Sequence, residues 1–144
     1  MAVRADYGTH GLVSDAWHPA FEQFGSMSLH SAFEKLAERP ITSRDYVNWL
    51  AVKTGAEPAV RLKTTDPDAI TAEFLNPEFK QPGFKGIGLN FRTWNQQMRQ
   101  PLLIAWERAM VSMSPQDGFL HERHTLDSLG LDRSDSECRL NLGE

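Results

Sequence analysis

The sequence predicts an α+β fold in which helices are followed by an antiparallel hairpin. Two apolar runs, 86–94 and 102–113, alternate polar and apolar residues as strands with one buried face do. A polar turn at residues 95–97 (Asn-Gln-Gln) separates the two runs. Upstream of them, helix-start signals precede apolar residues at helical spacing. These patterns predict one mixed unit whose hairpin spans residues 86–113.

The second apolar run contains residues that mark its ends and an interruption within it. Pro101 and Pro115 flank it, and a residue without an amide proton fits best at the start or just past the end of a strand. Residues 106–109 interrupt the alternation, which indicates a turn or a bulge inside the run. After a tight-turn signal at 116–118, residues 119–120 can add a short strand edge.

Three helices are predicted before the hairpin, at about 15–24, 43–56 and 67–75, with two further turns of helix at 31–38. The first rests on three aromatic rings at helical spacing, Trp17, Phe21 and Phe24, which we interpret as core residues. Pro40 stops the turns at 31–38.

The other two helices begin with clear signals. Thr42 and Asp45 have the spacing of a capping box, and Gly55 and Pro58 predict an end or kink near Gly55 because both residue types disfavour helix interiors. Asp66 is placed to cap the last helix. Pro67 follows at the first helical position, and Asn76-Pro77 ends the helix.

The length of 144 residues fits one domain, for which we expect residues 1–120 to form the α+β unit and 121–144 a polar, mobile tail. Hydrophobic residues make up 40% of the chain and charged residues 24%, as in ordinary globular proteins. The formal charge of −4 gives no positive field that would attract nucleic acid, so we expect no nucleic-acid partner.

Location and redox state have weaker signals. No apolar run approaches the roughly 20 residues that span a bilayer, and the first eleven residues lack the apolar middle of a secretory signal. Taken as written, the sequence predicts a cytoplasmic protein. The single cysteine, Cys138, excludes an internal disulfide.

A possible ligand site flanks the predicted hairpin turn. Arg92, Trp94 and Arg99 would form an exposed cationic and aromatic cluster that can stack on or pair with an anionic small molecule. The alternative is a solvated hairpin edge without a ligand.

Other chemistry-bearing residues give little support for catalysis. His121 and His124, with Asp127 and Cys138 downstream, do not match a known zinc spacing, so we expect a solvated polar turn and no metal. His18 has no local acid or nucleophile as a partner, and we interpret it as a packing or capping residue. Neither a phosphate-binding glycine loop nor a nucleophile elbow is present, so we expect no cofactor and no enzyme.

Four segments together resemble a known family: GLVSDAWHPAFEQFG, ITSRDYVNWLAVKTGAEPAVR, the run from DPDAITAEFLNPEF through FRTWNQQMRQPLLIA, and VSMSPQDGFLHERHTLDSLGLD. They look like the C-terminal portion of the periplasmic substrate-binding proteins of PQQ-dependent alcohol dehydrogenase systems, relatives of the branched-chain amino-acid binding proteins. The resemblance implies a two-lobed α/β type I periplasmic-binding-protein fold with a ligand cleft, export to the periplasm, and delivery of a solute to the membrane subunits of an ABC importer. It implies no catalysis.

The chain departs from this family in length, since the family is more than twice as long. We therefore expect a truncated or split solute-binding protein with an incomplete cleft, lacking the export signal and first lobe. The alternative is a small non-catalytic interaction domain that has lost ligand binding. Without the missing lobe, the large apolar residues must pack among themselves, and we expect self-association or a partner that carries that lobe; the residues concerned are Trp17, Phe21, Trp49, Phe74, Ile87 and Phe91.

Overall fold

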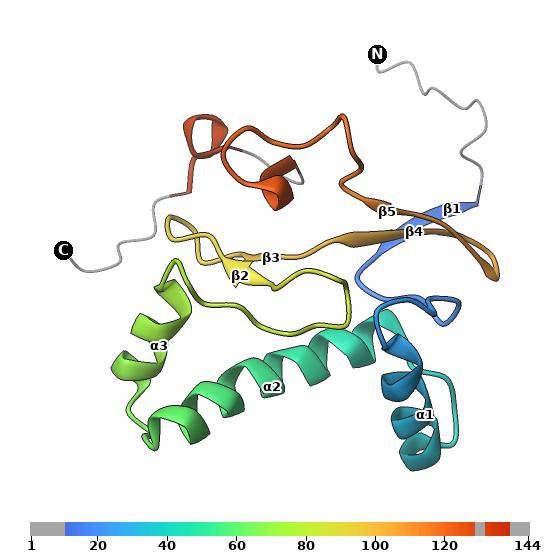
Figure 1. Ribbon diagram of the computed structural model, residues 1–144, viewed down its shortest axis with the longest axis horizontal. Coiled ribbons are helices and arrows are strands. Elements are labelled where there is room, and N and C mark those ends of the chain that lie inside the picture. Colours follow the sequence, from blue (N-terminus) through green and yellow to red (C-terminus); the bar gives the residue numbers. More distant parts are fainter. Residues whose placement is uncertain (1–10, 129–131, 139–144) are drawn as a thin grey trace.

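A computed structural model describes residues 11–128 and 132–138, and it combines helices with small antiparallel sheets, which confirms the predicted α+β class. Its elements in chain order are β1 (Leu12–Asp15), α1 (Ser26–Ala37), α2 (Ser43–Leu62), α3 (Pro67–Leu75), β2 (Asn90–Phe91), β3 (Met98–Arg99), β4 (Leu102–Trp106), β5 (Ala109–Ser114) and the 3₁₀ turns η1 (Thr125–Ser128) and η2 (Arg133–Asp135). In Figure 1 the long helix α2 runs below the strands, with α1 and α3 at its two ends. The first ten residues, with the expected absence of an export signal, lie outside the described residues, as do 129–131 and 139–144 of the predicted tail.

The strands form two antiparallel sheets rather than one hairpin. In the larger sheet β4 lies between β1 and β5, with Leu12 opposite Trp106 and a bulge between Ile104 and Ala105. In the smaller sheet β2 pairs with β3 around the turn at residues 95–97.

The predicted pairing of 86–94 with 102–113 is therefore wrong, although the strand character of 102–113 and its two proline boundaries are confirmed. The physical reason is the interruption at residues 106–109. Glu107 adopts a left-handed backbone with φ of 52°, which turns the chain and folds the second run onto itself. Because β5 and β1 already occupy both edges of β4, the first run pairs instead with nearby chain, through β3 and through an antiparallel bridge between Leu89 and Gln81.

The predicted helix at 15–24 does not form. Pro19 lies in the middle of that range, where it would remove a helical hydrogen bond and clash with the preceding turn. Trp17 and Phe21 are nevertheless buried, as predicted, whereas Phe24 is half exposed. Residues 119–120 form no strand either.

The later helices follow the sequence more closely. α1 extends the predicted turns towards the N-terminus and starts after Gly25 without a side-chain cap, which explains why no start signal was recognised for it. α2 begins with the predicted capping box of Thr42 and Asp45. α3 has the predicted bounds, with Asp66 accepting a hydrogen bond from the Asp68 amide at 3.2 Å.

The predicted end of α2 near Gly55 is wrong, because the helix continues through Pro58 to Leu62. Pro58 and Thr54, one turn before it, are both buried. Burial of the proline ring offsets part of the roughly 3 kcal/mol that an interior proline costs relative to alanine.

The core forms where the segment after β1 meets α2. Trp17 stacks on Tyr46 with ring centroids 4.4 Å apart, and the Tyr46 hydroxyl donates to the Gly83 carbonyl at 2.8 Å. The cluster around them also contains Ala16, Phe21, Leu29, Ile41, Leu50, Leu89 and Leu103. This packing fixes the loop between α3 and β2, and so positions the small sheet.

The segment after β5 returns to the small sheet (Figure 1). Leu126 in η1 is buried, so this part of the predicted tail contributes to the packed structure. Within the ranges that the structure describes, each helix is too short or too polar to cross a membrane.

Candidate functional site

An ion-pair cluster joins the small sheet to the C-terminal segment. Arg92 Nε donates to Asp127 Oδ1 at 2.7 Å, and Arg99 donates to both oxygens of Asp127, from Nε at 2.6 Å and from Nη2 at 2.9 Å. Arg92 directly follows β2, Arg99 ends β3, and Asp127 belongs to η1. Because β2 and β3 are antiparallel neighbours, the two guanidiniums reach one carboxylate, and both donate from Nε to the same oxygen, Oδ1.

The prediction that Arg92, Trp94 and Arg99 form an exposed cluster is thus wrong about exposure, because none of the three is exposed. Arg92 is only 3% exposed, and its Nη1 donates to Gln97 Oε1 at 2.6 Å. Arg99 is partly buried and uses its remaining nitrogen on the Phe91 carbonyl at 3.0 Å. Both arginines therefore hold the fold together, since a buried guanidinium needs a counter-charge and filled hydrogen bonds.

Asp127 is ionised throughout the physiological range. Burial pushes the pKa of its carboxyl upwards, but hydrogen bonds from Arg99 and Arg92 outweigh burial and lower the pKa to about 2. Two positive charges thus face one negative charge, which leaves the cluster net positive.

His124 lies next to this cluster. Its Nε2 is 3.2 Å from Asn90 Nδ2, and its Nδ1 accepts from the Leu126 amide at 3.2 Å. Burial lowers the pKa of His124, and the charge of Arg99 lowers it further. The ring is therefore neutral at pH 7 and acts as a hydrogen-bonding group.

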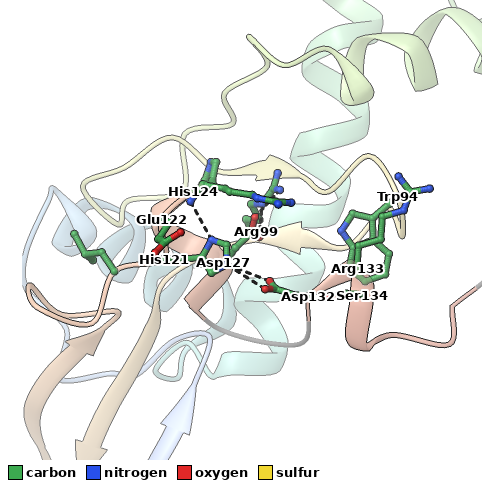
Figure 2. A pocket seen from close by; sticks show the side chains of 11 residues that line it. Trp94, Arg99, His121, Glu122, His124, Asp127, Asp132, Arg133 and Ser134 are labelled. Carbon is green, nitrogen blue, oxygen red and sulfur yellow. Dashed lines mark hydrogen bonds and ion pairs between the residues drawn. The ribbon is translucent and has the colours of Figure 1, made fainter.

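Beside the cluster, a groove of about 1020 Å³ opens between the small sheet and the C-terminal turns. Figure 2 shows Arg99 and Asp127 in its middle, His121 facing Asp132, and Trp94 and Arg133 near one another at one end. His121 Nε2 lies 3.2 Å from Asp132 Oδ1. The complete lining is Trp94, Arg99, Leu120, His121, Glu122, Arg123, His124, Asp127, Asp132, Arg133 and Ser134.

Two cations of this lining keep their charge available. Arg123 and Arg133 are exposed, and no carboxylate within residues 11–128 and 132–138 pairs with either of them. Of the three acids in the lining, Asp127 pairs with the two arginines, Asp132 faces His121, and Glu122 is exposed and makes no ion pair within the described residues. Arg123 and Arg133 can each pair with a small anion, with Trp94 offering an aromatic face.

The histidines and the cysteine considered in the sequence do not converge on a metal. Across the described ranges, no group of three or more His, Cys, Asp or Glu side chains could hold a metal ion. His121 and His124 line the groove, whereas Cys138 is an exposed free thiol. His18 accepts a hydrogen bond from the Ala20 amide at 3.2 Å, which agrees with a capping role in a turn.

Sequence reasoning missed the partner of the two arginines and a buried amine. Asp127 lies in a polar stretch without periodicity, so nothing in its local sequence marks it as a partner. The available signal was the placement of Arg92 and Arg99 on either side of a short turn, where two nearby cations need a counter-charge. Lys85 is 1% exposed. It lies between Gly83 and Gly86, and glycines around a lysine do not indicate that its side chain is buried.

Comparison with protein-family models, with curated proteins and with solved structures finds no match to this chain.

Proposed function

We propose that this chain is part of a solute-binding protein that serves an ABC importer linked to PQQ-dependent alcohol oxidation, and that the groove beside Arg99 binds its ligand. The observation that carries the proposal is that two segments of the family likeness, FRTWNQQMRQPLLIA and VSMSPQDGFLHERHTLDSLGLD, meet at one site. The first supplies Arg92 and Arg99, and the second supplies Asp127.

The proposal extends to fold, place and partners. The α+β unit would be part of a two-lobed type I periplasmic-binding-protein fold, located in the periplasm. Its partners would be the membrane subunits of the importer and the lobe that carries the other wall of the cleft. The function is binding and delivery without catalysis.

The charges in the groove favour a small organic anion as the ligand. Arg123 and Arg133 have no acidic partner among the described residues. Ser134, which follows Arg133 within η2, adds a hydroxyl to the lining. Guanidiniums bind carboxylates through paired N–H donors, which an alcohol of equal length cannot match. A carboxylate is also the chemical product of complete alcohol oxidation.

The test is calorimetric titration of the purified chain with propionate and with 1-propanol. We expect heat of binding for the carboxylate only, and a Kd at least about tenfold higher in Arg133→Gln and in Arg123→Gln, equivalent to about 1.4 kcal/mol. Arg108→Gln, which removes an exposed charge at the β4–β5 turn, is the matched control and should bind like the parent.

The second candidate is a non-catalytic interaction domain, which is favoured by apolar side chains on the surface. Leu36, Val60 and Phe119 are 87%, 76% and 77% exposed, and a contiguous apolar patch formed by side chains of this kind would mark a protein contact. If a panel of short carboxylates gives no binding, or if the arginine variants bind as tightly as the parent, the ligand groove is refuted and the interaction domain is the better assignment.

A further inference from the structure

Lys85 is a buried amine without an acidic partner in contact. It lies in the loop between α3 and β2, where its Nζ donates to the Pro101 carbonyl at 2.6 Å and to Gln100 Oε1 at 3.0 Å. The Tyr46 ring centroid is 5.0 Å from Nζ. No carboxylate of the described chain forms a salt bridge with this lysine, and Asp15 acts on it only at longer range.

Lys85 also borders a cavity separate from the groove beside Arg99. The cavity measures about 190 Å³, which is comparable to the roughly 150 Å³ of cavities that hold a benzene-sized molecule. Besides Lys85, its lining is mainly apolar, with Asp117 and Thr125 as the other polar members; the remaining lining residues are Phe24, Gly86, Ile87, Pro101, Met113, Pro115, Leu120 and Leu126. Asp117, Leu120 and Thr125 are exposed, so the cavity opens to solvent on their side.

The backbone around this cavity is strained. Phe24 and Phe84 have φ of 53° and 56°, a left-handed conformation that is uncommon for bulky residues. Phe24 lines the cavity, and Phe84 precedes Lys85. At Gly86, with φ of 74°, an added Cβ would lie 2.7 Å from the Phe24 ring, so only glycine fits there. Strain of this kind concentrates at binding sites.

Burial lowers the pKa of the Lys85 amine to about 7, against the opposing charge of Asp15. At pH 7 a large share of this amine is therefore neutral, whereas less than about a thousandth of an exposed lysine is. A neutral amine has a free electron pair and is the form that attacks a carbonyl carbon.

We propose that Lys85 binds a short aliphatic aldehyde covalently, as an imine, in this cavity. The Nζ electron pair forms a bond to the carbonyl carbon, and the carbonyl oxygen then leaves as water with the two protons that Nζ loses. No oxidant or reductant takes part, and water reverses the reaction. The apolar lining receives the alkyl chain, which sets this site apart from the charged groove proposed for an anion.

The test uses reductive trapping on the whole chain at pH 7, with butanal and sodium cyanoborohydride, and peptide mass spectrometry to locate the butyl groups. Lys80, which is exposed and lies in the same loop, is the internal control. We expect Lys85 to be labelled at least about tenfold faster than Lys80, because nearly all exposed lysine is protonated at this pH. The labelling rate of Lys85 should level off above pH 7, whereas that of Lys80 keeps rising.

Equal or slower labelling of Lys85 than of Lys80 in the folded chain overturns the proposal. Lys85→Arg keeps a cation and its donors but cannot form an imine, and it should lose the fast label while the slow labelling of Lys80 remains. A polar aldehyde, glyceraldehyde, should label Lys85 no faster than Lys80, because the cavity lining is apolar. A fast label with both aldehydes would contradict a site built for an alkyl chain.

Discussion

Asp127 is the shared counter-charge of two guanidiniums, and one of them is almost fully buried. Removing a carboxylate from such a cluster leaves uncompensated charge in a low-dielectric setting, which typically costs about 3–5 kcal/mol. Arg92 cannot relocate its charge to solvent, because its backbone is held in the β2–β3 turn by Gln97 at 2.9 Å. The stability of the small sheet therefore depends on this one side chain.

We expect Asp127→Asn to lower the free energy of unfolding by about 3 kcal/mol, measured by urea denaturation at pH 7. Asp117→Asn is the control, because Asp117 is exposed and makes no ion pair within the described residues, and it should change stability by less than about 0.5 kcal/mol. Equal losses in the two variants would contradict a structural role for the cluster.

The same carboxylate predicts a loss of stability in acid. Its pKa is about 2 in the folded chain against an ordinary 3.8, so the stabilisation is complete above about pH 4 and disappears as the pH falls towards 2. The difference corresponds to about 2 kcal/mol. Urea unfolding at pH 5 and at pH 2.5 should show this component in the parent but not in Asp127→Asn, and parallel profiles would refute it.

Lys85 predicts the opposite slope at higher pH. Its folded pKa of about 7 lies below the ordinary 10.5, so the unfolded chain binds more protons between these values and stability rises with pH. Between pH 7 and pH 9 the gain should be about 2–3 kcal/mol. Lys85→Met should abolish the slope in urea titrations, and a parent chain without any rise over this range would count against a buried neutral amine.

At this scale the sequence predicted which residues are core more reliably than which residues form a site. Trp17 and Phe21 were expected to be buried, and both are, because large apolar rings need no specific partner to leave water. The expected exposure of Arg92 was wrong, since burial of a charge depends on a partner that lies far along the chain. Alternation along a strand cannot reveal that Asp127, 35 residues after Arg92, folds back to pair with it.

Among the elements, the β4–β5 hairpin shows how two residues decide a topology. Glu107 and Arg108 form its turn, and Glu107 occupies the first central position with φ of 52°. A turn of this hand favours glycine at that position, because a side chain there is strained. The hairpin therefore forms despite its turn residue, because β4 pairs with β5 on one side and with β1 on the other.

Glu107→Gly should accordingly raise the free energy of unfolding by about 0.5–1 kcal/mol, because relief of strain exceeds the added freedom of the unfolded chain. Arg108→Gly is the matched control: Arg108 is not among the residues with positive φ, so glycine there should be neutral or destabilising. Thermal unfolding of both variants measures the difference, and a reversed order would disprove the assignment of strain to Glu107.

The two internal prolines explain why helix prediction succeeded in some segments only. Pro58 was expected to end α2 but is tolerated, because its ring is buried in a long helix that packs along its length. Pro19 was overlooked, yet it stands in a short segment without a packed helical face and excludes the helix at 15–24. Caps, by contrast, act locally, so the starts of α2 and α3 were predicted to the residue.

For the whole molecule, the question is how much apolar surface remains after folding. Trp17 and Phe21 found buried positions, while Ile87 stays 39% exposed. Large side chains on both helices and strands also face solvent, among them Leu36 on α1, Val60 on α2 and Trp106 on β4. Apolar area of this kind is seldom left uncovered on a soluble monomer when it forms a contiguous patch.

We therefore expect the isolated chain to self-associate or to bind a partner that covers this surface. Sedimentation velocity should show dimers or larger species at micromolar concentration, and an apolar dye should bind the native chain. A monodisperse monomer that unfolds sharply at high temperature without binding dye would show instead that the unit is self-sufficient.

The salt link from Asp127 to Arg92 and Arg99 also has a consequence for how the chain can be cut. A protease that cleaves in the mostly exposed segment at residues 116–123 would remove the covalent connection between both guanidiniums and the counter-charge held in η1. The fragment that remains would keep its helices but would carry two repelling cations where the β2–β3 turn closes. Cleavage there would favour local unfolding of the small sheet. The C-terminal turns thus stabilise the β2–β3 turn from a distant part of the chain.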